Sequence, residues 1–192
     1  TVLFTKQIDF KTYKTYIIMK PTFKTLATLF IASLVLGISS YVMASSPLTT
    51  IKLENVKSIE VSGNVSLILI QDAKEAVQIH DSYFGNNALV QQQGSVLRLS
   101  SYAAEPLKIV VSVAQLQNLT LSGESTVKTS GGMSLLSLNV KLKDYSSADL
   151  NMEVVQLVTK STDYAKLKLS GNSEDFQGYI ALNGQLQLDG FS

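Results

Sequence analysis

Two Asp-Tyr pairs in the C-terminal part of the sequence have the residue types and spacing to support chemistry. Asp144-Tyr145 recurs 19 positions later as Asp163-Tyr164. If the two copies lie in neighbouring strands, their carboxylates are one strand spacing apart, about 4.8 Å. Such a pair could bind calcium or act as an acid–base pair on a glycan. The alternative is that both aspartates cap turns, because aspartate accepts local backbone hydrogen bonds at corners.

The tyrosines form a second candidate site. Tyr145 and Tyr164 are predicted to stack as a pair, and Tyr179 is the candidate for a third position one repeat later. An exposed tyrosine ladder could contact a glycan or a protein. Stacked aromatic residues are also ordinary packing in repeat proteins, so the sequence leaves both interpretations open.

The sequence contains few of the residues that nucleophilic catalysis or zinc binding requires. His80 is the only histidine, and cysteine does not occur. A Ser/His/Asp triad would have to use His80 with Asp72 or Asp81, and no Gly-x-Ser-x-Gly elbow is present. A zinc site would lack most of its usual ligands. We therefore expect a surface histidine, with no catalytic residues, no metal site and no cofactor.

The elements that must position the Asp-Tyr pairs follow a tandem repeat. The segments 119–127, 142–150 and 162–169 resemble one another: residues 143–150 fall on 162–169 at a shift of 19, and residues 121–127 fall on 142–148 at a shift of 21. A weaker copy, 186–188, is related to 167–169 by the same shift of 19. A period of about 20 residues with alternating apolar positions is typical of a solenoid. It predicts that Leu121 and Leu142 stack in an interior ladder that apolar residues of the third repeat continue.

The rest of the domain also alternates with a period of two. No sustained helical period occurs between residues 51 and 192, so the fold class is all-β. We predict a parallel β-helix-like solenoid with coils of about 19–21 residues. Residues 51–113 are less regular, and we expect an antiparallel start or longer coils there.

The N-terminal residues indicate export. A basic segment, an uncharged apolar run over residues 26–38 and a small-x-small end at Ala44 follow one another in the order of a secretory signal. This predicts a signal peptide over residues 19–44, cleaved between Ala44 and Ser45. A retained membrane anchor is the alternative, although the apolar run is shorter than the ~20 residues that a span needs.

The remaining segments divide the chain further. Residues 1–18 are interpreted as an upstream extension before Met19, or as a long n-region. Residues 45–50 are a polar linker, and residues 51–192 form a single β domain. Without residues 1–44 the chain carries eleven basic and fourteen acidic residues, a net charge of −3. That balance lacks the basic footprint of a nucleic-acid-binding protein.

Three stretches in order carry a resemblance to a known family. They are Ile59-Glu-Val-Ser-Gly-Asn-Val-Ser-Leu67, residues 109–123 with their Ser-Gly end, and the tandem repeats after them. Over roughly residues 52–190 the chain resembles the putative autotransporter adhesin head domain, the head GIN domain, a domain of unknown function. The resemblance implies a right-handed β-helix-like solenoid on an exported protein of Gram-negative bacteria, and it implies no known activity.

The sequence departs from the family pattern at two corners and in its lack of cysteine. Lys143-Asp144 and Thr162-Asp163 stand where Ser-Gly pairs are expected, so the later corners should be less flexible. Family members are often lipoproteins, and this sequence has no cysteine for acylation.

These observations predict a non-catalytic, exported adhesion or interaction module of the envelope, in the periplasm or at the cell surface. Its partner would be an unknown envelope glycan or protein. Two alternatives stay open, namely a carbohydrate-active lyase or hydrolase, and a structural domain that forms homo-oligomers through the solenoid ends.

Overall fold

The computed structural model describes residues 49–80 and 88–192, which contain strands and no helix. The predicted extension 1–18, the signal peptide 19–44 with its Ala44/Ser45 cleavage site, and residues 45–48 of the linker lie outside the described residues. The last two linker residues belong to the first strand. In the described part of the chain, no helix is long and apolar enough to cross a membrane.

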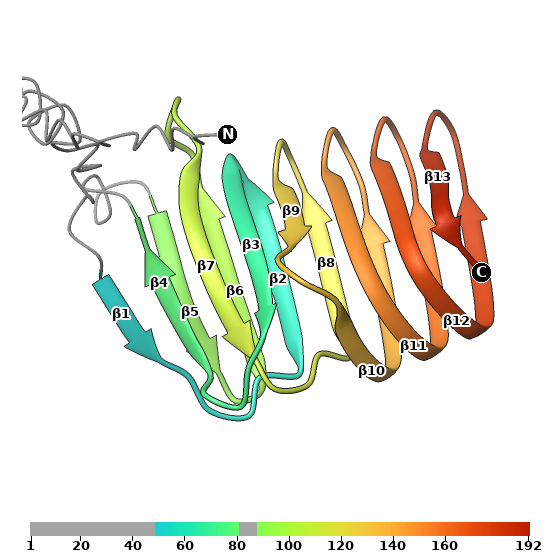
Figure 1. Ribbon diagram of the computed structural model, residues 1–192. Helices are drawn as coiled ribbons and strands as arrows, with labels where there is room; N and C mark the ends of the chain where they lie inside the picture. Colours follow the sequence, from blue (N-terminus) through green and yellow to red (C-terminus); the bar gives the residue numbers. More distant parts are fainter. Residues whose placement is uncertain (1–48, 81–87) are drawn as a thin grey trace, which may run out of the picture. The chain divides into compact units, whose positions relative to one another are not determined.

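Thirteen strands follow one another in the two described ranges, and Figure 1 labels them along the sheet. They are β1 (Thr49–Lys52), β2 (Ser58–Gly63), β3 (Val65–Gln71), β4 (Ala76–Ile79), β5 (Ala88–Gln93), β6 (Val96–Ser101), β7 (Leu107–Val113), β8 (Asn118–Ser122), β9 (Thr126–Thr129), β10 (Met133–Leu142), β11 (Ser147–Ser161), β12 (Lys166–Ile180) and β13 (Gln185–Phe191).

All of these strands belong to one curled sheet. The first row of the sheet is formed by β5, β6, β2 and β8, followed by the C-terminal parts of β10, β11 and β12. The second row is formed by β1, β4, β7, β3 and β9, followed by the N-terminal parts of β11 and β12 and then by β13. The long strands β11 and β12 run through both rows and join them.

The predicted repeat spacing is confirmed in the C-terminal half. β10 pairs with β11, and β11 with β12, in parallel at a sequence shift of 19. β9 pairs with β11, and β8 with β10, at a shift of 21. The pair Leu167/Leu186 extends the series to β13. Alternation located the strands, because side chains of one face recur at every second position, and the constant shifts located their register.

The N-terminal half is arranged differently from a simple stack in chain order. β2 pairs with the distant strand β8, where Ser58 lies opposite Asn118, and with β6 on its other side. β3 likewise lies between β7 and β9. The predicted antiparallel start is present, because β1 pairs with β4, β4 with β7, and β5 with β6 in antiparallel register. In the stack, the repeat formed by β8 and β9 therefore lies next to the repeat formed by β2 and β3, although β6 and β7 come between them in the sequence.

Inward side chains of both rows form one apolar cluster. Leu121 and Leu142 are cross-strand neighbours in this cluster, as predicted. The next residue of that ladder is Ser161, so the prediction of an apolar third member is wrong. Ser161 is buried, and its hydroxyl donates a hydrogen bond to the Ala165 carbonyl at 3.1 Å. A local backbone acceptor therefore permits a polar side chain in the core.

Candidate functional site

The corner between the two rows has the same backbone conformation in successive repeats. Gly63, Gly123, Asp144, Asp163 and Leu182 all have a positive φ, between 56° and 74°. Each follows or ends a strand of the first row. Glycine adopts this left-handed conformation freely, and aspartate tolerates it better than most residues. The two aspartates therefore replace glycine in a turn geometry that recurs along this chain.

The carboxylates of the corner bind the backbone of the preceding repeat. Asp144 Oδ2 accepts a hydrogen bond from the Gly123 N–H at 2.9 Å. Asp163 Oδ2 accepts one from the Asp144 N–H at 3.3 Å and another from the Thr162 hydroxyl at 3.1 Å. The two aspartates are neighbours, as their spacing predicted. Both aspartates lie at turns, as the capping interpretation expected, but the backbone N–H groups that they accept from belong to the preceding repeat and not to the local turn.

The predicted tyrosine pair is confirmed by the geometry of the corner. The ring centroids of Tyr145 and Tyr164 are 5.2 Å apart, and the ring planes differ by 6°. The two residues are 66% and 52% exposed. Backbone hydrogen bonds hold the pair in place, since the Tyr145 N–H donates to the Gly123 carbonyl and the Tyr164 N–H to the Asp144 carbonyl. The pair presents aromatic surface to solvent on a hydrogen-bonded support.

Tyr179 does not belong to this ladder, so its predicted place as a third member is wrong. It is the cross-strand partner of Lys160 on the first row. The register on both sides of the corner places Asn183 next to Tyr164 instead. The misassignment arose because Tyr179 follows Tyr164 too closely in the sequence to occupy the equivalent position of the next repeat.

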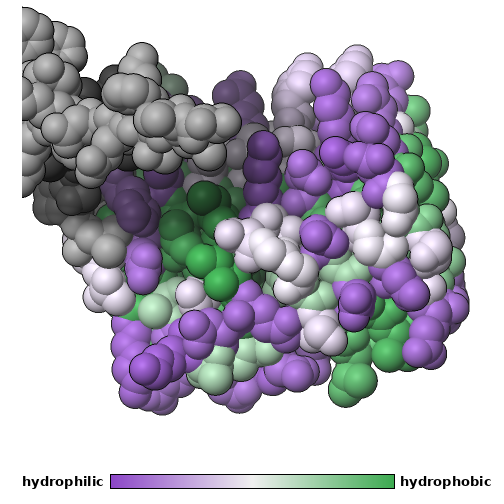
Figure 2. Space-filling model, in the orientation of Figure 1, coloured by the Kyte–Doolittle hydropathy of each residue, from purple (hydrophilic) through white to green (hydrophobic). Residues whose placement is uncertain are grey.

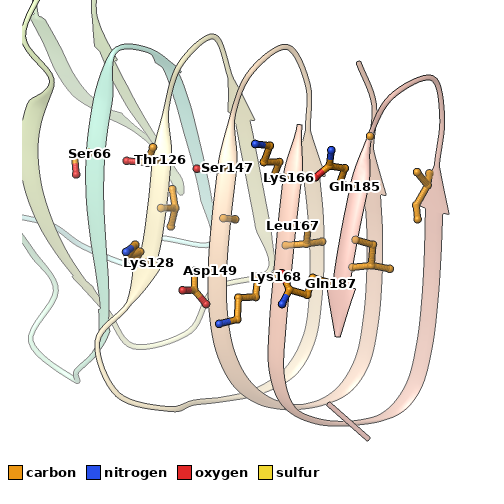
Figure 3. A pocket seen from close by; sticks show the side chains of 15 residues that line it. Ser66, Thr126, Lys128, Ser147, Asp149, Lys166, Leu167, Lys168, Gln185 and Gln187 are labelled. Carbon is orange, nitrogen blue, oxygen red and sulfur yellow. The ribbon is translucent and has the colours of Figure 1, made fainter. Parts of the chain in front are cut away.

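A hollow of about 930 Å³ begins two residues beyond the tyrosines, along the second row (Figure 3). Figure 3 shows its polar side chains in two columns across the strands: Ser66, Thr126, Ser147, Lys166 and Gln185 in one, and Lys128, Asp149, Lys168 and Gln187 in the other. Apolar residues complete the lining.

The charged column of the hollow alternates in sign. Register places Lys128 beside Asp149 and Asp149 beside Lys168. The Lys168 Nζ is 3.0 Å from Asp189 Oδ2. The hydrogen bond to Asp189, the charge of Asp189 and the charge of Asp149 together raise the pKa of Lys168 above the ordinary lysine value. The positive charges of this column are therefore offset by Asp149 within it and by Asp189 beside it.

His80 is exposed at the end of β4. Asp81 lies outside the described residues, and Asp72 is exposed in the turn after β3, where its carboxylate accepts a hydrogen bond from the Lys74 N–H. Among the residues that the structure describes, no group of three or more His, Cys, Asp or Glu side chains is arranged to hold a metal ion.

Lys141 and Lys160 are not among the site residues predicted from the sequence. These two exposed lysines are direct cross-strand partners on the first row, and Tyr179 follows them in the same column. The signal was present in the sequence, since the shift of 19 that relates Asp144 to Asp163 also relates Lys141 to Lys160 and Lys160 to Tyr179.

The parallel repeats, the joined rows and the left-handed corners define an all-β repeat domain. The chain belongs to the family described as putative auto-transporter adhesin, head GIN domain, whose model matches residues 55–192. The resemblance of the sequence to this family is thereby confirmed. No curated protein matches the chain.

Solved structures of similar fold come from several bacteria. One is a putative lipid binding protein from Parabacteroides distasonis, with 16% identity and a TM-score of 0.50 over 77% of this chain. The match spans 61% of that protein, which is less than two thirds of its length. A putative adhesin from Bacteroides fragilis has 14% identity and a TM-score of 0.43, covering 75% of this chain and 93% of that one. At these identities the similarity concerns the fold alone.

Proposed function

We propose that this chain is a non-catalytic interaction module of the bacterial envelope, and that the stacked tyrosines form part of its contact surface. The observation that carries the proposal is the face-to-face pair of exposed rings, Tyr145 and Tyr164. Aromatic side chains provide large contact area at low entropic cost, and they are enriched where proteins bind partners. The adhesin description of the family supports the same role.

The finer features of the proposal follow from the sequence. The repeats form a right-handed, β-helix-like solenoid, and the predicted signal peptide exports the chain to the periplasm or surface of a Gram-negative bacterium. The ligand is an envelope glycan or protein. Asp144 and Asp163 act as turn residues in this proposal, because their carboxylates accept backbone hydrogen bonds.

The test is binding to envelope glycans and proteins before and after removal of the rings. Tyr145→Ala combined with Tyr164→Ala should weaken binding about tenfold, which corresponds to about 1.4 kcal/mol. Tyr102→Ala is the matched control, since Tyr102 is 80% exposed and lies in the loop between β6 and β7. Unchanged binding by the double variant would refute the role of the tyrosine pair.

Self-association is the second candidate function, and the last repeat favours it. β13 pairs only with β12 among the described strands. Apolar side chains are exposed there, including Ile180, Leu182 and Leu188, and Figure 2 shows apolar surface at the end of the sheet where β12 and β13 lie. An unpaired strand edge is a template for pairing with another chain. Light scattering on the wild type and on Leu188→Lys would reveal a dimer that the charge abolishes.

A further inference from the structure

The outer face of the first row carries two adjacent lysines in one cross-strand column. Lys141 of β10 and Lys160 of β11 are direct partners in the parallel register, and Tyr179 of β12 is the next residue along. All three side chains are exposed. Neighbouring strands are about 4.8 Å apart, so the two lysine side chains leave the sheet from adjacent positions.

The charges of Lys141 and Lys160 have no acidic cross-strand neighbour among the described strands, whereas two lysines of the second row lie beside Asp149. Like charges directly opposite in a sheet are destabilising, whereas opposite charges stabilise. The second row alternates Lys128, Asp149 and Lys168. In the first row, the neighbour of Lys141 on the other side is Thr120. Within residues 49–80 and 88–192, none of the ion pairs includes Lys141 or Lys160.

A groove of about 380 Å³ lies beside the lysines on the same face. Asn139 and Val158 line it, and they precede Lys141 and Lys160 by two residues, which places them on the same side of their strands. The other lining residues are mostly amides and a hydroxyl: Gln117, Asn118, Ser137, Leu138 and Gln156. Side-chain amides offer both donors and acceptors of hydrogen bonds.

We propose that this lysine strip, defined as Lys141, Lys160, Tyr179 and the adjoining groove, binds a linear anionic polysaccharide. The lysines pair with carboxylate or sulfate groups of successive sugars. The amides of the groove hydrogen-bond the hydroxyl groups, and the Tyr179 ring packs against a sugar face. The inference rests on the proposed role as an interaction module, and it names the chemistry of the ligand.

The width of the anion distinguishes this ligand from other polyanions. Residues 45–192 carry a net charge of −3, which opposes close approach to an extended anionic surface such as a membrane or a nucleic acid. A single polysaccharide chain can follow the strip and avoid the acidic remainder. The polar amides also suit hydroxyl-rich sugars better than apolar lipid chains.

The experiment measures binding of polygalacturonate oligomers by calorimetry, with neutral dextran oligomers of similar length alongside. The protein used is the full chain after any cleavage of its signal. Lys141→Gln with Lys160→Gln should weaken polygalacturonate binding about tenfold. Lys74→Gln with Lys108→Gln removes the same charge elsewhere and should change binding less than about twofold. Binding should also weaken as salt is raised, because exposed charges are screened.

Three results would overturn the lysine strip. The first is no wild-type binding to polygalacturonate or to a sulfated polysaccharide. The second is an equal loss in both double variants, which would reflect net charge alone. The third is equally tight, equally lysine-dependent binding to DNA or to vesicles containing anionic lipid.

The outcome is separable from that of the tyrosine test. The lysine strip and the tyrosine pair have no residue in common, since Tyr179 lies on the first row and Tyr145 and Tyr164 at the corner. If only the tyrosine variants lose binding to an envelope partner, the interaction module stands and the lysine strip is rejected. If only the lysine variants lose binding to polygalacturonate, the strip stands without the tyrosine pair.

Discussion

At the scale of single residues, polar groups in the interior and at the corners determine how each repeat closes. Asp144 and Asp163 provide side-chain acceptors for backbone N–H groups. Ser146 provides a donor, since its hydroxyl bonds the Lys143 carbonyl at 2.7 Å. Ser125, at the equivalent position of the preceding repeat, is buried with no hydrogen-bond partner for its hydroxyl among the described residues. The same residue type therefore has opposite energetic effects in neighbouring repeats.

This contrast predicts the effect of two matched substitutions. Ser125→Ala should stabilise the fold by about 1 kcal/mol, because it removes an unsatisfied buried hydroxyl. Ser146→Ala should destabilise it by about 1 kcal/mol, because it deletes a made hydrogen bond. Ala165 occupies the corresponding position of the next repeat and shows that the site accepts a methyl group. Urea unfolding of the two variants measures both changes, and equal effects in both would contradict the argument.

The ion pair of Lys168 predicts a pH dependence. Because Asp189 and Asp149 raise the pKa of Lys168 in the folded state, protonated Lys168 stabilises the fold. That contribution is complete below the ordinary lysine pKa and is lost as the pH rises through the raised value. Asp189→Asn should lower the Lys168 pKa, measured by NMR titration of the lysine side chain. Asp175→Asn is the control and should leave it unchanged.

At the scale of elements, close approach of backbones sets the requirement for glycine at some corners. A Cβ at Gly63 would overlap the Ser101 carbonyl oxygen on the neighbouring strand β6. Gly94 also has a positive φ, yet nothing lies within 4 Å of its Cβ position. Both glycines adopt the positive φ that their turns require, and Gly63 in addition allows β2 and β6 to approach closely.

The two glycines should respond differently to alanine. Gly94→Ala should cost about 1 kcal/mol, the penalty of a left-handed conformation for a residue with a Cβ. Gly63→Ala should cost about 3 kcal/mol or more, because a backbone clash is added to that penalty. Thermal or urea unfolding of the two proteins provides the comparison. A similar cost for both would show that β2 and β6 separate without loss.

At the scale of the whole domain, stability depends on how many neighbours each strand has. β11 pairs with β9, β10 and β12, and its inward residues are buried. β13 pairs only with β12 among the described strands, and most of its residues are exposed. Local opening therefore costs less free energy at β13, because few buried contacts must be broken.

Hydrogen exchange tests this gradient. Backbone amides of β13 should exchange at least about tenfold faster than those of β11, since local opening precedes global unfolding there. Mass spectrometry of peptides covering the two strands gives the rates. If the protein self-associates through β13, its exchange should slow as the protein concentration is raised. Uniform rates at low concentration would contradict the gradient.

Some features of the fold and of the site were accessible from the sequence. The shifts of 19 and 21 located the parallel register of β9 to β12, because a sheet that buries one face must keep its alternation in phase. The same shifts paired Asp144 with Asp163 and Tyr145 with Tyr164. A repeat relates neighbours in the stack directly, so the corner site followed from spacing alone.

Other features were decided only by the tertiary structure. The pairing of β2 with the distant strand β8 has no signal in local alternation, since any two strands with the same pattern can pair. The hydrogen bond that the Asp144 carboxylate accepts from the Gly123 N–H forms only when the two repeats meet. The sequence by itself thus determined the period and the faces of the repeats. Long-range backbone pairing decided the order in which the repeats stack. It also placed Tyr179 in one column with Lys160 and Lys141.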